Sequence, residues 1–361
     1  MLTDPDKTNL TPVEYEHSPN LVPLLNQLGL SLLISTYQAG KVITVGVHND
    51  AADIHFYHFE QAMGIARTPT GLMVGSRRQF WYLVGNPSLA SKIKPEGKYD
   101  VVFLTRSSHF TGPIMGHEMD WGNQQLWFAN TLFSCLCVIQ PEFNFVPKWT
   151  PPFISQLASE DRCHLNGMVL ENGEPRYVTA LGETDTPAGW RENKASGGCL
   201  MEVRSNQILL RGLCMPHSPR MFQNQLYFLD SGKGHLCLYD ASSHLPTVVA
   251  AMNGYTRGME IWGHYAFIGL SRVRETNVFG GIPIAERREH LRCGLAIVDL
   301  RTGQIAGFLH FKSGVEEIFE VKVIPGYRCP MLSGPLPDVD QTDPIWLAPP
   351  LKVGTSKPVT S

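Results

Sequence analysis

An internal repeat is the feature that most constrains the fold of this 361-residue chain. A short, mostly apolar segment followed by a turn recurs along the sequence, and its clearest copies cover residues 32–36, 72–76, 126–130, 176–180, 226–230 and 265–269. The copies lie about 40 to 55 residues apart, a spacing typical of four-stranded β-propeller blades. Glycine and proline are frequent, and long amphipathic helical patterns are scarce. We therefore predict an all-β, six-bladed β-propeller of four-stranded blades.

The innermost strand of each unit can be located as well, and the candidates begin near Gln61, His117, His164, His217, Arg257 and Glu316. The strand at 316–323 has no outer strands after it, whereas the strands at 31–36, 41–47 and 53–58 have no inner strand before them. Joining these segments completes the sixth blade, closes the ring and removes exposed sheet edges. A seventh blade within residues 84–99 and a β-sandwich are the alternatives.

The domain organisation follows from this pattern. We predict an N-terminal tail at 1–28, a single propeller domain at 29–333 and a proline-rich C-terminal tail at 334–361. Two long insertions, at 182–198 and 272–292, follow the second strand of their blades. This position is on the face where the inner strands begin, so the insertions are expected to form a lid or rim over the channel mouth. The alternative is that they are ordinary surface insertions.

Composition limits the classes of partner. A net charge of −3 gives no electrostatic basis for binding nucleic acid or a membrane surface, so neither is expected as a partner. The N-terminus lacks the pattern of a signal peptide, and we expect a cytoplasmic protein. The eight cysteines include no CxxC pair, which favours buried, reduced thiols over a zinc knuckle. The sequence leaves the oligomeric state open.

Three histidines carry the strongest functional signal. His117, His164 and His217 occupy the same position in three consecutive copies when the copies are aligned by hand. The copies with His117 and His217 align without a gap, and the copy with His164 needs a longer turn. Equivalent strands of a propeller converge on one axis, so the imidazoles should converge too. Three convergent imidazoles form an open site for a divalent transition metal such as zinc, iron, copper or nickel. The alternative is that each histidine binds backbone groups or water.

Neighbouring residues could supply further roles. Arg257 could bind a carboxylate or phosphate of a substrate. Glu118 and Glu260 are candidate bases or partners that orient the imidazoles, and Tyr255 is a candidate general acid or base. The structural alternatives are a salt bridge from Arg257 to Glu260 or another acid of the channel, and hydrogen bonds between blades.

Three further residues are weaker candidates for the same mouth. His109 lies in the segment that leads to His117, and it could reach the site from there. Cys163 and Cys214 closely precede two of the histidines, which makes a thiolate ligand conceivable but less favoured than a buried thiol.

Several motifs resemble those of a family of bacterial conserved hypothetical proteins, some of which carry tetratricopeptide repeats. They are Leu33–Lys41 (LISTYQAGK), Gly116–Asp120 (GHEMD), His164–Met168 (HLNGM) and Met215–Arg220 (MPHSPR). The resemblance covers roughly residues 20–333 and implies no activity. The predicted architecture is also similar to six-bladed propellers of the gluconolactonase and peptidyl-hydroxyglycine lyase type, which hold a divalent metal on the central axis. The lyase type uses three histidines from different blades, and the matching positions here are His117, His164 and His217.

We therefore predict a metal-dependent enzyme with a three-histidine channel site that acts on a small anionic molecule or a peptide. Lyase, hydrolase and oxidative chemistry all stay open. The alternative is a non-catalytic propeller that serves as a binding platform for a protein or peptide. A purely structural metal that ties the blades together is a third possibility.

Overall fold

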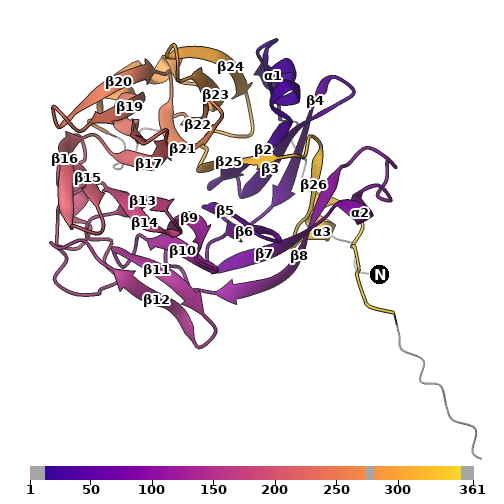
Figure 1. The fold of residues 1–361 in the computed structure, drawn as a ribbon, viewed down its shortest axis with the longest axis horizontal. Helices are drawn as coiled ribbons and strands as arrows, with labels where there is room; N and C mark the ends of the chain where they lie inside the picture. Colours follow the sequence, from indigo (N-terminus) through magenta and orange to yellow (C-terminus); the bar gives the residue numbers. More distant parts are fainter. Residues whose placement is uncertain (1–12, 274–279, 351–361) are drawn as a thin grey trace, which may run out of the picture.

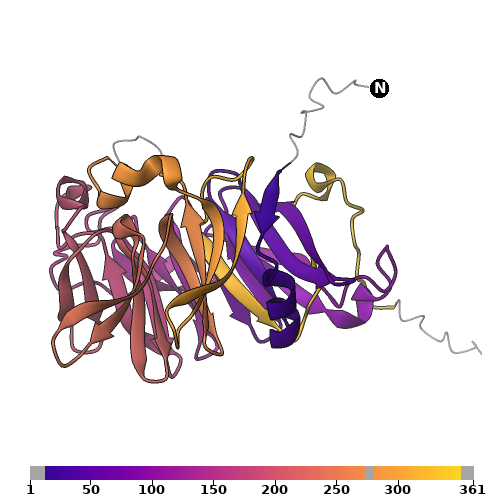
Figure 2. The same cartoon turned by 90° about the horizontal axis from the view of Figure 1, so that it is seen from above.

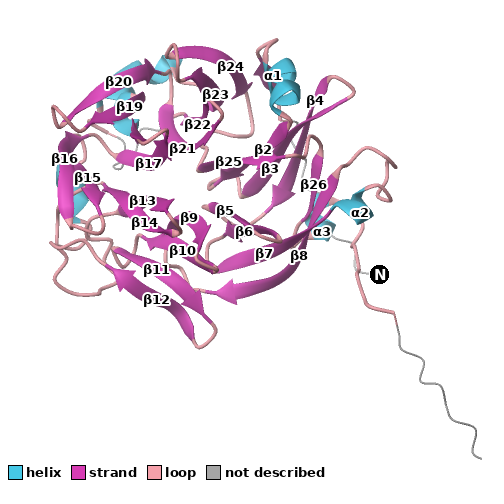
Figure 3. Ribbon diagram, viewed as in Figure 1, coloured by secondary structure: helices cyan, strands magenta, loops and turns pink. Residues whose placement is uncertain are grey.

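The computed structural model describes residues 13–273 and 280–350. Six small sheets stand in a ring around a central axis (Figure 1), and almost every element of the ring is a strand (Figure 3). Each sheet has a core of four antiparallel strands. The fold is therefore the six-bladed β-propeller of four-stranded blades that the repeat predicts.

The four blades built from residues 116–311 follow chain order from the axis outwards. Three of them are β9 (Gly116–Gly122), β10 (Gln125–Asn130), β11 (Cys135–Gln140) and β12 (Phe143–Trp149); β13 (Leu165–Glu171), β14 (Glu174–Ala180), β15 (Gly198–Glu202) and β16 (Gln207–Leu213); and β17 (Pro216–Phe222), β18 (Gln225–Asp230), β19 (His235–Asp240) and β20 (Leu245–Ala251). The fourth is β21 (Tyr255–Trp262), β22 (Tyr265–Ser271), β23 (Cys293–Asp299) and β24 (Gln304–Phe311). The inner strands of neighbouring blades contact one another around the axis.

The two ends of the propeller close the ring in one shared blade. Its inner strand β25 (Glu320–Pro325) pairs with β2 (Leu30–Thr36), which is followed by β3 (Lys41–His48) and β4 (Ala51–His58). This confirms the predicted closure. The remaining blade is β5 (Ile65–Thr68), β6 (Gly71–Gly75), β7 (Gln79–Asn86) and β8 (Val101–Phe110), and β26 (Pro330–Ser333) adds a parallel strand at its outer edge.

Both predicted tails contribute elements to the described fold. Within 1–28, β1 (Tyr15–His17) pairs with β24, and the helix α1 (Leu21–Leu28) buries its apolar face in the core. Gly29 ends this helix with a φ of 63°, the left-handed conformation that glycine adopts without strain. Within 334–361, the short helix α3 (Pro337–Asp340) places Asp340 so that its carboxylate accepts a hydrogen bond from the His58 backbone N–H.

The insertion at 84–99 does not hide a seventh blade, because it forms the short helix α2 (Pro87–Ala90) and a loop between β7 and β8. All eight cysteines are buried and free of disulfides. Packing between blades is apolar, as in the perpendicular contact of Phe80 and Phe128, whose ring centroids are 4.9 Å apart. Across residues 13–273 and 280–350, no helix has the length and apolar character needed to span a membrane.

Candidate functional site

The structure brings the three histidines to one cavity at a mouth of the central channel. His117 lies on β9, His217 lies on β17, and His164 directly precedes β13. The cavity has a volume of about 260 Å³. Its other lining residues are Tyr37, Met63, Met115, Asp161, Leu181, Trp190, Arg191, Met215, Tyr255, Arg257, Glu317 and Phe319. The sequence-predicted Arg257 and Tyr255 are therefore at the site.

The insertion 182–198 lines this cavity, and the insertion 272–292 packs against the same apolar cluster. Within 182–198, the 3₁₀ helix η1 (Gly189–Asn193) places the buried Trp190 ring against His164, with centroids 4.6 Å apart. Within 272–292, the 3₁₀ helix η3 (Pro283–His290) carries Ile284, which belongs to the same apolar cluster as Trp190. The turns of η1 and η3 stand on the same face of the ring in the edge-on view of Figure 2. The first insertion thus forms part of the cavity wall, and the described part of the second stands on the same face of the ring.

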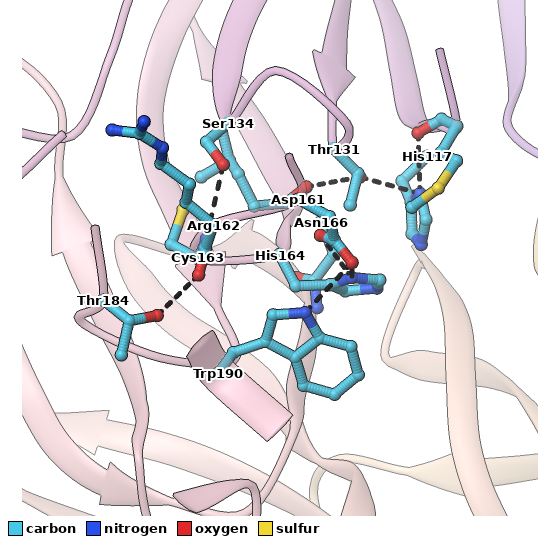
Figure 4. Close-up of polar contacts among 12 residues, drawn as sticks. His117, Thr131, Ser134, Asp161, Arg162, Cys163, His164, Asn166, Thr184 and Trp190 are labelled. Atoms are coloured by element: carbon cyan, nitrogen blue, oxygen red, sulfur yellow. Dashed lines mark hydrogen bonds and ion pairs between the residues drawn. The ribbon is translucent and has the colours of Figure 1, made fainter. Parts of the chain in front are cut away.

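The hydrogen bonds of His117 fix its tautomer. Its Nδ1 lies 2.9 Å from the carbonyl oxygen of Met115 and 2.8 Å from the hydroxyl of Thr131. The Thr131 hydroxyl donates its only hydrogen to the carbonyl of Leu165, at 2.6 Å (Figure 4). Both neighbours of Nδ1 are therefore acceptors, so Nδ1 carries the hydrogen. The Nε2 of the neutral ring is left with a lone pair.

The other two histidines are anchored in the same way. The Nδ1 of His217 lies 2.9 Å from the carbonyl oxygen of Met215, which can only accept. The Nδ1 of His164 lies 2.9 and 3.1 Å from the two carboxylate oxygens of Asp161 (Figure 4). Trp190 donates a further hydrogen bond to Asp161 at 3.0 Å. Among the described residues, none of the three Nε2 atoms has a hydrogen-bond partner within the chain.

The cavity keeps two of these rings neutral. Burial lowers the pKa of His117 and of His217 well below the ordinary value, and the nearby Arg257 guanidinium lowers both further. The Arg257 guanidinium itself lies 3.5 Å from the centroid of the Phe319 ring and 3.3 Å from a carboxylate oxygen of Glu317. Burial raises the pKa of Tyr255, so this phenol is protonated. The site combines neutral imidazoles with one buried cation.

Two of the candidate catalytic residues, Glu118 and Glu260, do not line the cavity. Glu118 forms an ion pair with Arg220, and Glu260 forms ion pairs with Arg67 at 2.7 Å and Lys322 at 3.4 Å. All these groups belong to the inner strands, but none of them lines the histidine cavity. Each carboxylate is held by at least one cation, so we assign both to a buried ion-pair cluster on the axis. The salt bridge of Arg257 that was the structural alternative is made with another acid of the channel, Glu317, and not with Glu260.

Strand pairing also corrects the alignment of the three histidines. Gly116, Pro216 and Leu165 occupy equivalent positions, because they pair with Asn130, Asp230 and Ala180 at the ends of the second strands. His117 and His217 follow this position by one residue, whereas His164 precedes it. Asn166 is the true counterpart of the two other histidines. His164 still reaches the cavity because it occupies the turn that leads into β13.

The weaker candidates do not contribute to the cavity. His109 lies on the outer strand β8, where its ring contacts the Asn144 carbonyl oxygen at 3.1 Å. Burial raises the pKa of Cys163 and of Cys214 to about 12, and neither cysteine lines the cavity. The sequence reasoning missed Asp161, although its spacing of three residues before His164 was a signal of a carboxylate that orients an imidazole.

The side chains at the site do not stand in a preformed metal-binding arrangement. In residues 13–273 and 280–350, no three His, Cys, Asp or Glu side chains stand close enough together to hold a metal ion. The His117 and His164 rings are perpendicular, with centroids 4.9 Å apart. Binding of one metal by all three histidines would therefore require the rings to approach one another.

A family model described as a domain of unknown function, DUF4915, matches residues 19–332. The chain belongs to this family. No curated protein shows a significant match. This agrees with the resemblance to uncharacterised proteins. The likeness in arrangement to propellers of the gluconolactonase and hydroxyglycine lyase type stays a prediction.

Solved structures support the fold alone. A protein of unknown function from Bacteroides caccae is similar over 82% of this chain and 99% of its own, with 10% identity and a TM-score of 0.51. A chain from a nidogen/laminin complex covers the same shares with 10% identity and a TM-score of 0.49, which carries no functional argument.

Proposed function

We propose that the cavity is a transition-metal site with His117, His164 and His217 as ligands, and that the protein acts there on a small anionic molecule or a peptide end. The observation that carries this proposal is the shared anchoring of the three rings. Each Nδ1–H is bound by a protein acceptor, and each Nε2 is left available at one cavity. Histidines that bind metals have this arrangement, because the second acceptor fixes the tautomer and the orientation of the ring.

The chemistry of the donor set fits a metal better than a bare anion. Neutral imidazole lone pairs attract a cation and repel an anion. The lowered pKa of His117 and His217 keeps both rings in the unprotonated form that binds a metal. When bound, such a metal would polarise a substrate oxygen or lower the pKa of a bound water.

The remaining residues have roles that follow from their positions. The Arg257 guanidinium binds the carboxylate or phosphate of the substrate, and Glu317 holds the guanidinium in place at 3.3 Å. The protonated Tyr255 can donate a hydrogen bond or a proton. Asp161 orients His164, and Trp190 covers this pair from the rim and excludes water. These roles serve lyase, hydrolase and oxidative chemistry equally.

Elemental analysis of protein without an affinity tag tests this proposal. The wild type and the variants His164→Ala and His117→Ala/His164→Ala/His217→Ala are compared after reconstitution with zinc, iron, copper or nickel. His109→Ala is the matched control, because this histidine lies outside the cavity. We expect near-stoichiometric metal in the wild type and the control, and none in a triple variant with an unchanged circular-dichroism spectrum. A wild type that binds none of the four metals would contradict the proposal.

A binding platform is the second candidate, and the buried Arg257 favours it. A fixed cation stacked on Phe319 can bind an anionic peptide end without any metal. This candidate requires chelator-treated protein to bind a short peptide with a free C-terminus, and Arg257→Met to lose that binding. If binding depends on the metal, the platform is excluded.

A further inference from the structure

We infer that the metal-free cavity binds an uncharged aromatic molecule that carries at least two hydroxyl groups. This inference goes beyond the proposed function, because it concerns a ligand that the imidazoles bind directly. His117 and His217 line the cavity and are only 6% and 5% exposed, yet no residue of the described chain bonds either Nε2. Two buried polar groups at one cavity without a protein partner point to a ligand.

The free nitrogen atoms of the cavity require hydrogen-bond donors. The Nδ1 of His117 and of His217 donates to a backbone carbonyl oxygen, so the Nε2 of each neutral ring is an acceptor. The Nδ1 of His164 is bound to Asp161, which makes its Nε2 a third acceptor in the neutral form of that ring. Hydroxyl groups supply the matching donors, whereas a carboxylate or an ether supplies none.

The charged residues of the cavity wall balance one another. Among the described lining residues, Asp161 and Glu317 are negative and Arg191 and Arg257 are positive. Glu317 pairs with Arg257 at 3.3 Å. Asp161 accepts a hydrogen bond from Trp190, and the Arg191 guanidinium lies 5.4 Å from the centroid of the same indole ring. The metal-free cavity therefore attracts neither an anion nor a cation, whereas a bound metal would add the positive charge that favours an anionic substrate.

The rest of the wall is apolar and favours an aromatic body. Met63, Met115 and Met215 line the cavity together with Leu181 and Phe319. Methionine side chains adapt to the shape of a ligand and make favourable contacts with aromatic rings. The volume of about 260 Å³ lies below the range of about 300–1,000 Å³ that is typical of pockets for drug-sized ligands. A single aromatic ring with short polar substituents matches this size.

The opposing interpretation is that water alone bonds the Nε2 atoms and that the cavity has no ligand of its own. Resorcinol, a benzene ring with two hydroxyl groups on non-adjacent carbons, is a suitable probe because it does not chelate metals as catechol does. The matched control is 1,3-dimethoxybenzene, which keeps the ring and loses both donors. The analogues 3-hydroxybenzoate and 3-hydroxybenzylamine add a negative or a positive charge.

Calorimetric titration and ligand-observed NMR measure binding to the full chain after treatment with a chelator. We expect resorcinol to bind one to one with a Kd of about 1 mM or tighter, and 1,3-dimethoxybenzene to bind about tenfold more weakly or worse. Neither charged analogue should bind more tightly than resorcinol. His117→Phe/His217→Phe removes two acceptors and should weaken resorcinol binding about tenfold or more, whereas His109→Phe, outside the cavity, should not.

The ligand series on the wild type decides the question even if the double variant does not fold. The inference is overturned if the wild type binds no resorcinol, binds 1,3-dimethoxybenzene as tightly, prefers 3-hydroxybenzoate, or binds glucose in place of resorcinol. None of these results changes the metal content of a separate metal-loaded preparation. A wild type that binds resorcinol but none of the four metals would support this inference and contradict the proposed function.

Discussion

Asp161→Asn tests how the orientation of the His164 ring affects metal binding, because it leaves His164 itself unchanged. The Asp161 carboxylate accepts hydrogen bonds from two donors, the His164 Nδ1–H at 2.9 and 3.1 Å and the Trp190 indole N–H at 3.0 Å. Asparagine has the same shape, but it replaces one acceptor oxygen with an amide N–H₂ group. The amide nitrogen must then face one of the two donors, so one hydrogen bond is lost along with the negative charge.

The expected magnitude follows from that loss. A hydrogen bond to a charged group contributes about 1.5–3 kcal/mol, and loss of a partner that orients a metal-binding histidine lowers metal affinity about 10–100-fold. At about 1.4 kcal/mol per tenfold, the affinity loss corresponds to about 1.4–2.8 kcal/mol, which agrees with the hydrogen-bond value. We therefore expect Asp161→Asn to weaken metal binding by this factor.

Chelator competition measures the affinity, and circular dichroism verifies the fold. Asp185→Asn is the matched control, because Asp185 pairs with Arg162 from the insertion 182–198 without contacting a histidine. Trp190→Phe removes the other donor and keeps the ring, so its affinity loss should be smaller than that of Asp161→Asn. An Asp161→Asn protein that is folded and binds metal as tightly as the wild type would refute the orienting role.

Three further predictions concern stability. The pKa values of His117 and His217 lie below that of an unfolded histidine, about 6.5, so their contribution to stability is complete above that pH and is lost as the pH falls below it. The variant His117→Gln/His217→Gln should therefore lose less of its melting temperature on acidification than the wild type. Identical pH profiles of the melting temperature would contradict this prediction. Arg220→Met leaves the buried Glu118 without its ion-pair partner and should lower the free energy of unfolding, measured in urea, by about 3–5 kcal/mol. The double variant Glu118→Gln/Arg220→Met should recover part of this loss. A loss below about 1 kcal/mol would contradict the ion-pair cluster. Removing residues 320–361 deletes β25 and reopens the ring, so this truncation should lose its cooperative melting transition, whereas a retained transition would show that closure is dispensable.

The ring could be predicted from the sequence because its signal is repeated. Each second strand combines apolar residues with a turn at a fixed distance, and the unpaired segments at the two ends complement each other. The inner strands were located less well. β5 begins at Ile65 rather than Gln61, and β25 begins at Glu320 rather than Glu316, because the residues just before both strands are largely apolar but lie outside the sheet.

The site could be predicted only in part, since side-chain direction depends on register. The alignment placed His164 beside His117 and His217, but strand pairing gives that position to Asn166. Glu118 was expected at the cavity because it follows His117, yet its carboxylate is held by Arg220 in the axial cluster. Partners such as Arg220 come from other blades, and no local pattern in the sequence predicts them.

The two long insertions could likewise be predicted only in part. Residues 182–198 and 272–292 were expected on the face of the channel mouth, and their position between the second and third strands made this possible. The contact between Trp190 and His164 could not be foreseen, because it depends on the path of the loop. Of the second insertion, residues 274–279 lie outside the described residues.

Anomalous X-ray diffraction from crystals of the metal-loaded protein tests the central claim most directly. Data recorded on both sides of the absorption edge of the bound metal locate that metal without reference to activity. We expect a single strong peak within bonding distance of the Nε2 atoms of His117, His164 and His217. A metal-loaded crystal with no peak in this cavity, or with its peak elsewhere on the chain, would contradict the three-histidine site.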